Sequence, residues 1–556
     1  MIINIDKTSS RGLSKTTSIQ GTEIEYHVFG STYKEDVNGI ILNMLQSNTS
    51  KLKLLEGNFS IVALDKAARR VIFLSDRGGK QNLFFKLVDG SITVSDDLWE
   101  LKRDQNLTLQ DVDRLAVKQQ IFFFTPLGGK TFFKGVEHYP AATITSIDLK
   151  NDTKVSERYW HFSFTENTYS HADKFDIFDE TFSKSVRTIV DLHPDESTFA
   201  LGLSGGLDSR IIPYYAQKHG MDIEAFTIGT ERPRGVLKSN DFRSADQIAN
   251  HFGISRKTVA FDGISFKEQL EMECELAPET SSQIFKIVDS GSIKSRVLIT
   301  GASGFLIGAS PMYSSILETN LLEHTLRYQS MLGIKPKYSS AKKALNALFG
   351  FSFNDRTDIK LDGFGSIFSS DEIEQSLAEI STFYDEFHNL SDIEKLMNYA
   401  IFILGRNNEK GAFESMLDQK QSYSIYNPYF LDVIPYLSES DLLDRALFRK
   451  FVSYRIPEIS GIQGQDFRPA INASSSVGRL IHRVGAMGNF VIRGYGVMNY
   501  KNWVHSRSFK RLSQMVSQEY DSSPASQYLD LELGDISVHH GVTMNALKMK
   551  KFLAKL

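Results

Sequence analysis

Short, mostly apolar and β-rich runs alternate with polar turn residues over roughly the first 165 residues of the chain. Such runs between turn residues are typical of β-strands. The clearest runs are 57–65, 70–77, 91–95 and 142–148. Two stretches with helical periodicity interrupt them, near 36–47 and 107–121, and Thr108 or Asp111 is placed to cap the second. The pattern predicts a mainly antiparallel sheet structure with two helices.

From about residue 172 the pattern changes to helices that alternate with short apolar strands. The predicted elements are a helix at 173–192, a strand at 198–203, a helix at 209–219 and a strand at 223–229. This alternation predicts a parallel α/β sheet, in which ligands bind at the carboxyl ends of the strands. Beyond about residue 310 the sequence is mainly helical, with capping boxes at 369–372 and 391–394.

The predicted strand at 198–203 ends in a Ser-Gly-Gly-Leu-Asp-Ser turn, residues 204–209, which opens a helix. Glycines let a ligand approach the backbone closely, and N–H groups at a helix N-terminus attract anions. The two serine hydroxyls can donate to the same anion. No Lys follows the second glycine, so the turn is not the phosphate loop typical of kinases and GTPases. We expect this turn to bind phosphate groups by another mode.

Composition limits the classes of function. A chain of 556 residues is too long to fold around one hydrophobic core, so we expect two or more domains. The net charge of −4 gives no field that would gather nucleic acid. The apolar runs are far shorter than a bilayer span and the N-terminus lacks signal-peptide features, so we expect a cytoplasmic protein with no membrane partner. The basic amphipathic stretch 544–556 permits a membrane-surface location, but its length favours a packed or solvated helix.

Two sets of short motifs resemble the asparagine synthetase B family, whose members join a class II glutamine amidotransferase domain to an ATP-pyrophosphatase synthetase domain. The motifs of the first domain are 57–59, 75–85, 130–136 and 158–160. The motifs of the second domain are 204–210, 226–229, 241–249 and 427–432. Each motif is short, and their order and spacing over most of residues 50–460 carry the resemblance.

The resemblance implies an α/β protein with an N-terminal Ntn-hydrolase-like antiparallel α/β sandwich at 1–165. A parallel α/β ATP-pyrophosphatase (PP-loop) synthetase domain at 172–470 is expected to follow, then a helical C-terminal extension at 471–556 packed on the synthetase domain. The implied cofactors are ATP and Mg²⁺. The residues expected to bind ATP or pyrophosphate are Leu203, Ser204, Gly205, Gly206, Leu207, Ser209, Thr227, Ile228, Gly229, Thr300 and Gly301. Asp208, Asp241 and Arg449 are the expected catalytic residues, and Asp208 is also the expected Mg²⁺ ligand.

The first domain departs from the family at its nucleophile. Glutaminase members carry a Cys after the initiator Met, but Ile2 stands at that position here and the first Cys is Cys274. The Arg-Gly-Pro-Asp segment that holds glutamine in the family is also absent. We therefore expect this domain to lack glutamine hydrolysis, although a processed nucleophile at Thr8 or Ser9 is conceivable.

The second domain departs from the family in its loop at 301–308. Ala302, Phe305 and Leu306 stand where the resemblance predicts acidic residues. Because Mg²⁺ prefers oxygen ligands, their loss is expected to weaken or alter catalysis. The family also has a Lys upstream of the 456–458 segment, and three cations compete for that position. They are Arg445, Arg449 and Lys450.

The expected function is that of an ATP-dependent amide-forming ligase. It would activate a carboxylate as its acyl-adenylate, release pyrophosphate, and pass the acyl group to ammonia or to a substrate amine, as do the family's β-lactam synthetases and lasso-peptide cyclases. The substrate would be a small molecule or a peptide, and a homodimer is possible. The acid-poor 301–308 loop favours an alternative, a catalytically silent nucleotide-binding or scaffold protein. The acyl substrate, the amine and the pathway stay open.

Overall fold

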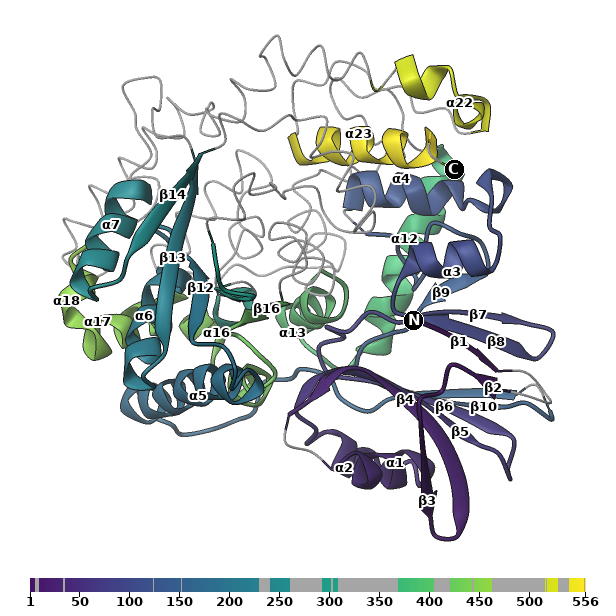
Figure 1. Ribbon diagram of the computed structural model, residues 1–556, viewed down its shortest axis with the longest axis horizontal. Coiled ribbons are helices and arrows are strands. Elements are labelled where there is room, and N and C mark those ends of the chain that lie inside the picture. Colours follow the sequence, from purple (N-terminus) through teal and green to yellow (C-terminus); the bar gives the residue numbers. More distant parts are fainter. Residues whose placement is uncertain are drawn as a thin grey trace.

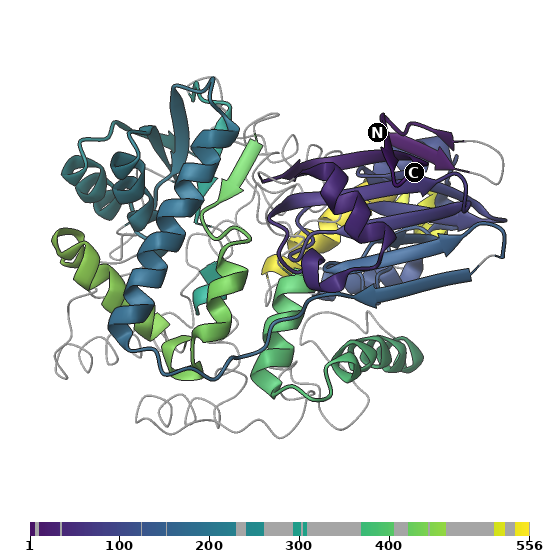
Figure 2. The same cartoon turned by 90° about the horizontal axis from the view of Figure 1, so that it is seen from below.

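A computed structural model describes residues 1–5, 10–33, 36–123, 125–151, 153–229, 241–260, 293–301, 304–308, 369–404, 421–442, 445–462, 516, 518–528, 540–554 and 556. Two α/β bodies lie side by side, one built on antiparallel sheets and one on a parallel sheet (Figure 1). A single extended stretch after residue 158 leads from the first body to the long helix of the second (Figure 2). The predicted fold class is confirmed.

The first body contains two antiparallel sheets, with strand orders β2-β1-β8-β7-β9 and β11-β10-β6-β5-β4-β3. The strands of the five-stranded sheet are β1 (Ile2–Ile5), β2 (Ser10–Arg11), β7 (Phe84–Val88), β8 (Ser91–Ser95) and β9 (Val136–His138). Those of the six-stranded sheet are β3 (Lys15–Ile19), β4 (Thr22–Thr32), β5 (Gly57–Asp65), β6 (Arg70–Ser75), β10 (Thr143–Asp148) and β11 (Thr153–Arg158). All four strand runs predicted from the sequence are present.

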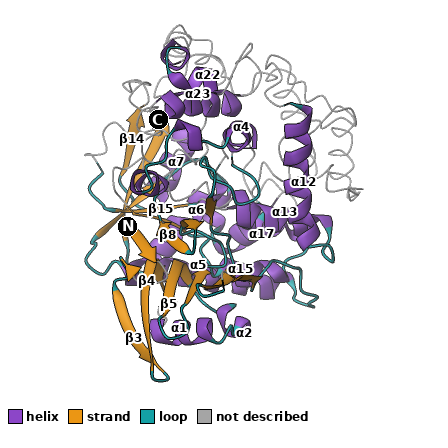
Figure 3. Cartoon of the chain, turned by 90° about the vertical axis from the view of Figure 1, so that its right-hand side faces the viewer, coloured by secondary structure: helices purple, strands orange, loops and turns teal. Residues whose placement is uncertain are grey.

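Strand β5 is buried on both of its faces, which explains its nearly continuous apolar sequence. Val62 and Leu64 join the core between the two sheets. Ile61 and Ala63, which point the other way, join the cluster that includes helix α1 (Val37–Leu45). That helix and α2 (Thr49–Leu52) cover the outer face of the six-stranded sheet (Figure 3). The first body is therefore a layered α/β sandwich.

The helix predicted at 107–121 is divided in the structure. Thr108 and Asp111 form a capping box around a 3₁₀ turn (Leu109–Asp111), and helix α4 begins only at Arg114. The backbone N–H of Asp113 donates to the carbonyl of Phe132 over 2.8 Å, so the chain is drawn out of the helix at this point. Helix α4 (Arg114–Phe123) packs in one apolar cluster with α3 (Leu98–Asp104). A long-range contact has overridden a local helical preference.

The second body is a parallel sheet with strand order β14-β13-β12-β15-β16. Its strands are β12 (Thr198–Gly202), β13 (Asp222–Gly229), β14 (Arg256–Ala260), β15 (Val297–Thr300) and β16 (Gln421–Ser424), and every pairing between them is parallel. Helices α6 (Leu207–Lys218) and α7 (Asp241–His251) connect the first three strands. The sheet thus has β12 at its centre, with β13 and β14 added on one side and β15 and β16 on the other.

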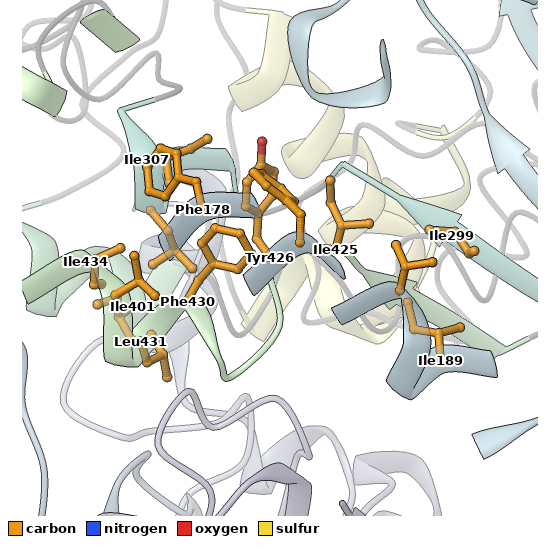
Figure 4. Packing of buried hydrophobic residues seen from close by; sticks show 14 of the residues in the cluster. Phe178, Ile189, Ile299, Ile307, Ile401, Ile425, Tyr426, Phe430, Leu431 and Ile434 are labelled. Atoms are coloured by element: carbon orange, nitrogen blue, oxygen red, sulfur yellow. The ribbon is translucent and has the colours of Figure 1, made fainter. Parts of the chain in front are cut away.

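The longest helix of the second body is α5 (His171–Leu192), close to the predicted 173–192. Its buried Phe178 and Phe182 pack against Phe430 and Phe451 (Figure 4 shows the centre of this cluster). The other helices include α12 (Ser370–Glu386), α13 (Asp392–Tyr399), α15 (Phe430–Val433), α16 (Glu439–Leu442), α17 (Ala446–Arg455), α18 (Pro457–Ser460) and α22 (Pro524–Tyr528). Both predicted capping boxes are present, at Ser369 with Glu372 and at Ser391 with Glu394.

The C-terminal helix α23 (His540–Ala554) packs beside α4 of the first body (Figure 1). Its buried Phe552 contacts Trp99 and Phe132, and Tyr384 of α12 belongs to the same apolar cluster. The sequence placed this helix on the synthetase domain, whereas its main partner is the first domain. No helix within the described ranges is both long enough and apolar enough to cross a membrane.

Lys174 of α5 and Asp441 of α16 form a nearly buried ion pair, with 2.6 Å between Nζ and Oδ2. Burial by itself would raise the pKa of Asp441, but the Lys174 ammonium and the donors of Ser438 outweigh it and hold that pKa below its usual value. The pair joins the long helix to the segment that leads to Arg445.

We expect Asp441→Asn to lower the free energy of unfolding by about 3 kcal/mol at pH 7, because Lys174 is left buried without its counter-charge. Urea denaturation measures this loss. Since folding lowers the pKa of Asp441, the carboxylate stabilises the protein above the unfolded-state pKa of about 4, and the difference between the two proteins should shrink as pH falls below that value. Asp191→Asn is the control, because Asp191 pairs with Arg187 on the exposed surface of the same helix. Equal losses for both variants would contradict the prediction.

Candidate functional site

The 204–209 loop lies at the carboxyl end of β12, where the order of the strands reverses. β12 pairs with β13 on one side and with β15 on the other, and the chain proceeds to β14 in one direction and to β16 in the other. Open α/β sheets bind their ligands in the crevice at such a switch point. The topology therefore places the Ser-Gly-Gly-Leu-Asp-Ser loop where a ligand is expected.

The two serines of the loop are hydrogen-bonded to each other and to the loop backbone. Their Oγ atoms lie 3.2 Å apart, the Ser204 N–H donates to Ser209 Oγ over 3.1 Å, and the Gly206 N–H donates to Ser204 Oγ over 3.0 Å. Gly206 is the N-cap of α6, with φ of −69°, and the described residues include no side-chain cap for this helix. The loop is thus preformed at a helix N-terminus, a position that attracts anions.

Gly301 brings the end of β15 into contact with the same helix N-terminus. A Cβ atom at this position would lie 2.5 Å from Asp208 Cβ and 3.3 Å from the Ser209 nitrogen. No side chain can be accommodated at such distances without movement of α6, so the glycine is required by close packing. The preceding Thr300 accepts a backbone hydrogen bond from Ile425 over 3.0 Å, which links this point to the end of β16.

Arg210 lies beneath the loop and is 1% exposed. Its Nη2 donates to the Gly205 carbonyl over 2.9 Å and its Nη1 to the Ile462 carbonyl over 2.7 Å. A guanidinium cannot lose its proton in a protein, so this side chain keeps a positive charge directly behind the glycines. Arg210 both fixes the Gly205 peptide and favours an anion at the loop.

Asp208 is the point where three distant segments of the chain meet. Its Oδ1 accepts a 2.6 Å hydrogen bond from the Tyr426 hydroxyl, and its Oδ2 pairs with Arg445 Nη2 at 2.8 Å. Burial, and then the negative charge of Asp208, raise the pKa of Tyr426 well above its usual value. The hydroxyl therefore keeps its proton and donates a hydrogen bond to Asp208. Tyr426 itself lies between Ile425 and Phe430 in the apolar cluster (Figure 4).

Arg445 adopts a left-handed backbone conformation, with φ of 54°, as the residue that precedes helix α17. This region is uncommon for a residue with a side chain and is found more often at functional sites. Of the three cations that the sequence left open, Arg445 is the one that the structure pairs with Asp208, and Arg449 lies one turn further along α17. Neither Tyr426 nor the Arg445 pairing was deduced from the sequence. The 427–432 motif next to Tyr426 was the available signal.

The other expected residues divide into three groups. Leu203 and Thr227 are joined within the sheet, since the Thr227 hydroxyl donates to the Leu203 carbonyl over 2.6 Å and the Leu203 N–H donates to Phe226. Ile228 and Gly229 end β13 at the same edge of the sheet. Asp241 begins α7, but its side chain, like residues 302–303, the Phe305 side chain, Thr8, Ser9 and Cys274, lies outside the described part.

The position expected for a glutaminase nucleophile holds an apolar side chain. Ile2 lies in β1, paired opposite Ser95, and packs against the apolar cluster of α3 and α4. A small cavity in this domain is lined by residues such as Phe84, Thr131 and His138, and no residue of the 204–209 loop lines it. Within the described ranges, no three His, Cys, Asp or Glu side chains are grouped to hold a metal ion.

In comparisons with known proteins, a separate family model matches part of each of the two bodies. Residues 179–303 match the asparagine synthase family model, and residues 25–160 match the glutamine amidotransferase domain model. The first match contains β12, the 204–209 loop and Gly301, and the second contains most of the six-stranded sheet. No curated protein matches the chain.

Solved structures align only weakly. The allosteric regulatory enzyme of purine biosynthesis aligns at 9% identity over 44% of this chain and 62% of its own, with a TM-score of 0.19. The U34-tRNA thiolase NcsA from Methanococcus maripaludis aligns at 16% identity over 44% of this chain and 85% of its own, with a TM-score of 0.20. The chain spans less than two thirds of the first of these relatives, and scores this low support no inference about activity.

We expect Gly301→Ala to lower the free energy of unfolding by about 1–3 kcal/mol, because the added Cβ overlaps Asp208 in a packed region. Gly202→Ala, at the end of β12, is the matched control, since a Cβ there meets only Phe226 at an ordinary 3.8 Å. Urea denaturation of both variants measures the difference. Equal stability of the two variants would show that the close approach of β15 and α6 is not as tight as described.

Proposed function

We propose that this chain, which belongs to an asparagine synthetase-like family, is an ATP-dependent ligase that forms an amide bond through an acyl-adenylate, without hydrolysing glutamine. The observation that carries the proposal is the arrangement of residues at the N-terminus of α6. There a preformed glycine loop at the strand-order switch point is combined with Asp208, Arg210 and Arg445. A helix N-terminus with two neighbouring guanidinium groups is suited to a polyanion such as pyrophosphate.

In the proposed reaction, an oxygen of the substrate carboxylate attacks the α-phosphorus of ATP, and the bond from that phosphorus to the bridging oxygen of pyrophosphate breaks. An amine then attacks the acyl carbon, AMP leaves, and the amine gives up a proton. The loop N–H groups at the start of α6 would bind the β- and γ-phosphates, and Arg210 would balance their charge from behind. In this proposal Arg445, which pairs with Asp208, would move to the phosphates as negative charge develops on the leaving group.

Asp208 is the described residue that fits Mg²⁺, because the ion is commonly held by one or two carboxylates together with substrate phosphates. Mg²⁺ would supply charge neutralisation for the departing pyrophosphate. The Tyr426 hydroxyl fixes Oδ1 of this carboxylate, so the orientation of Asp208 is set before any ligand binds. A single well-oriented carboxylate is consistent with the lack of acidic residues at Ala302 and Leu306.

The amine donor is proposed to be ammonia or an amine of the substrate itself. Ile2 offers no nucleophile at the position of the family's Cys, and its side chain is packed in an apolar cluster. A silent nucleotide-binding protein is the second candidate. The observation that favours it is that both carboxylate oxygens of Asp208 already have protein donors.

If the ligase reaction is correct, ATP should be converted to AMP and pyrophosphate, not to ADP and phosphate. Incubation with Mg²⁺ and panels of amino-acid, peptide and sugar-acid substrates, with detection of both nucleotides and of pyrophosphate, tests this directly. We expect Asp208→Asn to reduce pyrophosphate release by at least about 100-fold, because stabilisation by a metal ion is worth several kcal/mol in the transition state.

Asp222→Asn is the control for this experiment. Asp222 lies at the opposite, amino end of the sheet, where it accepts a hydrogen bond from Thr198. Formation of ADP would exclude adenylation. ATP binding with no turnover on any substrate would favour the silent protein.

We expect no glutaminase activity from the purified 556-residue chain. The reason is chemical, since Ile2 provides no thiol or hydroxyl to attack the amide of glutamine. Glutamate release is measured with glutamine, ATP and Mg²⁺ against a buffer blank. Release well above the blank would refute this part of the proposal and direct attention to another nucleophile in the first domain.

A further inference from the structure

Arg77 of the first domain binds the segment of the second domain that contains Tyr426. The side chain of Arg77 is 2% exposed, and both of its terminal nitrogens donate to the carboxylate of Asp432. Its Nη2 also donates to the carbonyl of Pro428 over 3.2 Å. The guanidinium lies 5.8 Å from the centre of the Trp160 ring. Arg77 therefore holds the 426–432 segment by three N–H donors from a buried position.

The loop that carries Arg77 is itself fixed by a buried carboxylate. Asp76 accepts backbone hydrogen bonds from Phe59 over 3.1 Å and from Gly78 over 2.9 Å, and further bonds from Lys80 and Gln81. Burial raises the pKa of Asp76 although these donors oppose the shift. Because these buried hydrogen bonds fix the loop, the backbone of Arg77 has little freedom to move relative to the core of the sandwich.

The 426–432 segment is also anchored on helix α5. The Ser185 hydroxyl donates to the side chain of Asn427 over 2.9 Å, and the hydroxyls of Thr188 and Tyr429 lie 2.9 Å apart. The first residue of the segment is Tyr426, whose hydroxyl holds Asp208. One short segment thus connects Arg77, α5 and the N-terminus of α6.

We propose that Arg77 is a positioning residue for the ATP-binding loop and that the first domain, through this contact, completes the ATP site of the second. The inference rests on the proposed function in so far as ATP is the ligand of the loop. Arg77 fixes Pro428 and Asp432, the fixed segment holds the Tyr426 hydroxyl, and the hydroxyl orients Asp208. A domain without a glutaminase nucleophile then retains a role in nucleotide binding.

The test begins with Arg77→Lys, which keeps the charge but replaces the planar fork that binds Asp432 and Pro428 together. We expect ATP affinity, measured by calorimetry with Mg²⁺, to fall by about 2- to 30-fold, the range typical of couplings between distant residues. Asp432→Asn removes the same contact from its exposed side, where misfolding is less of a concern, and should have an effect of similar size.

Arg158→Lys is the matched control. Arg158 is another arginine of the first domain that binds a carboxylate of the second, Glu386 at the end of α12, and its guanidinium lies over the rings of Phe387 and Phe402. We expect its ATP affinity to equal that of the wild type, even if its melting temperature falls as much as that of Arg77→Lys. Stability alone would therefore not account for the difference between the two variants.

A double-mutant cycle distinguishes positioning through Tyr426 from a general structural effect. If Arg77 acts through the Tyr426 hydroxyl, Arg77→Lys should weaken ATP binding in the wild type but add little further loss in Tyr426→Phe. Fully additive losses would overturn this route. An Arg77→Lys affinity equal to that of wild type and of Arg158→Lys would overturn the proposal while leaving the ATP site intact. Failure of the wild type itself to bind ATP would instead refute the proposed function.

Discussion

The close packing at the N-terminus of α6 is the constraint on which the rest of the candidate site depends. Gly301 allows β15 to approach Asp208 and Ser209, Arg210 fixes the Gly205 carbonyl from below, and Tyr426 fixes Asp208 from the side. Each of these contacts is short and involves a group that has little freedom to move. A loop held in this way has lost its conformational entropy before a ligand arrives, so less of the binding free energy is spent on ordering it.

The charges around this loop differ from those expected of a site that relies on several metal-binding carboxylates. Ala302 and Leu306 provide no acid, whereas Arg210 is buried beneath the glycines and Arg445 is paired with Asp208. Guanidinium groups and divalent cations both neutralise phosphate oxygens. If the loop binds pyrophosphate as proposed, these guanidinium groups would supply part of the positive charge that balances it.

The two domains are joined by more than a linker. Arg77, Arg158 and Lys118 of the first domain each bind a carboxylate of the second, and α23 packs beside α4. These partners are separated by more than 200 residues in the chain. The first domain is therefore part of the framework of the second, which gives a physical reason for a sandwich fold without a nucleophilic cysteine to be present in the chain.

The sequence by itself determined the local structure and marked the loop at 204–209 as the candidate site. The β-rich runs between turn residues predicted β5 and β8 at their observed bounds, the helical pattern predicted α5, and Ser-Gly-Gly-Leu-Asp-Ser marked the loop after β12. These features depend on neighbouring residues and on burial patterns, which are visible in a single sequence. The order of motifs also indicated the family that the comparisons support.

Only the tertiary structure decided which distant side chains complete the site. Tyr426 and Arg445 lie 218 and 237 residues from Asp208, so no periodicity links them, and only the structure shows that Arg445, among Arg445, Arg449 and Lys450, pairs with Asp208. The same limit applies to the helix expected at 107–121, which a bond from Asp113 to Phe132 divides, and to the location of α23 on the first domain. Long-range contacts outweigh local preference at these places because burial and satisfied hydrogen bonds are worth more than helix propensity.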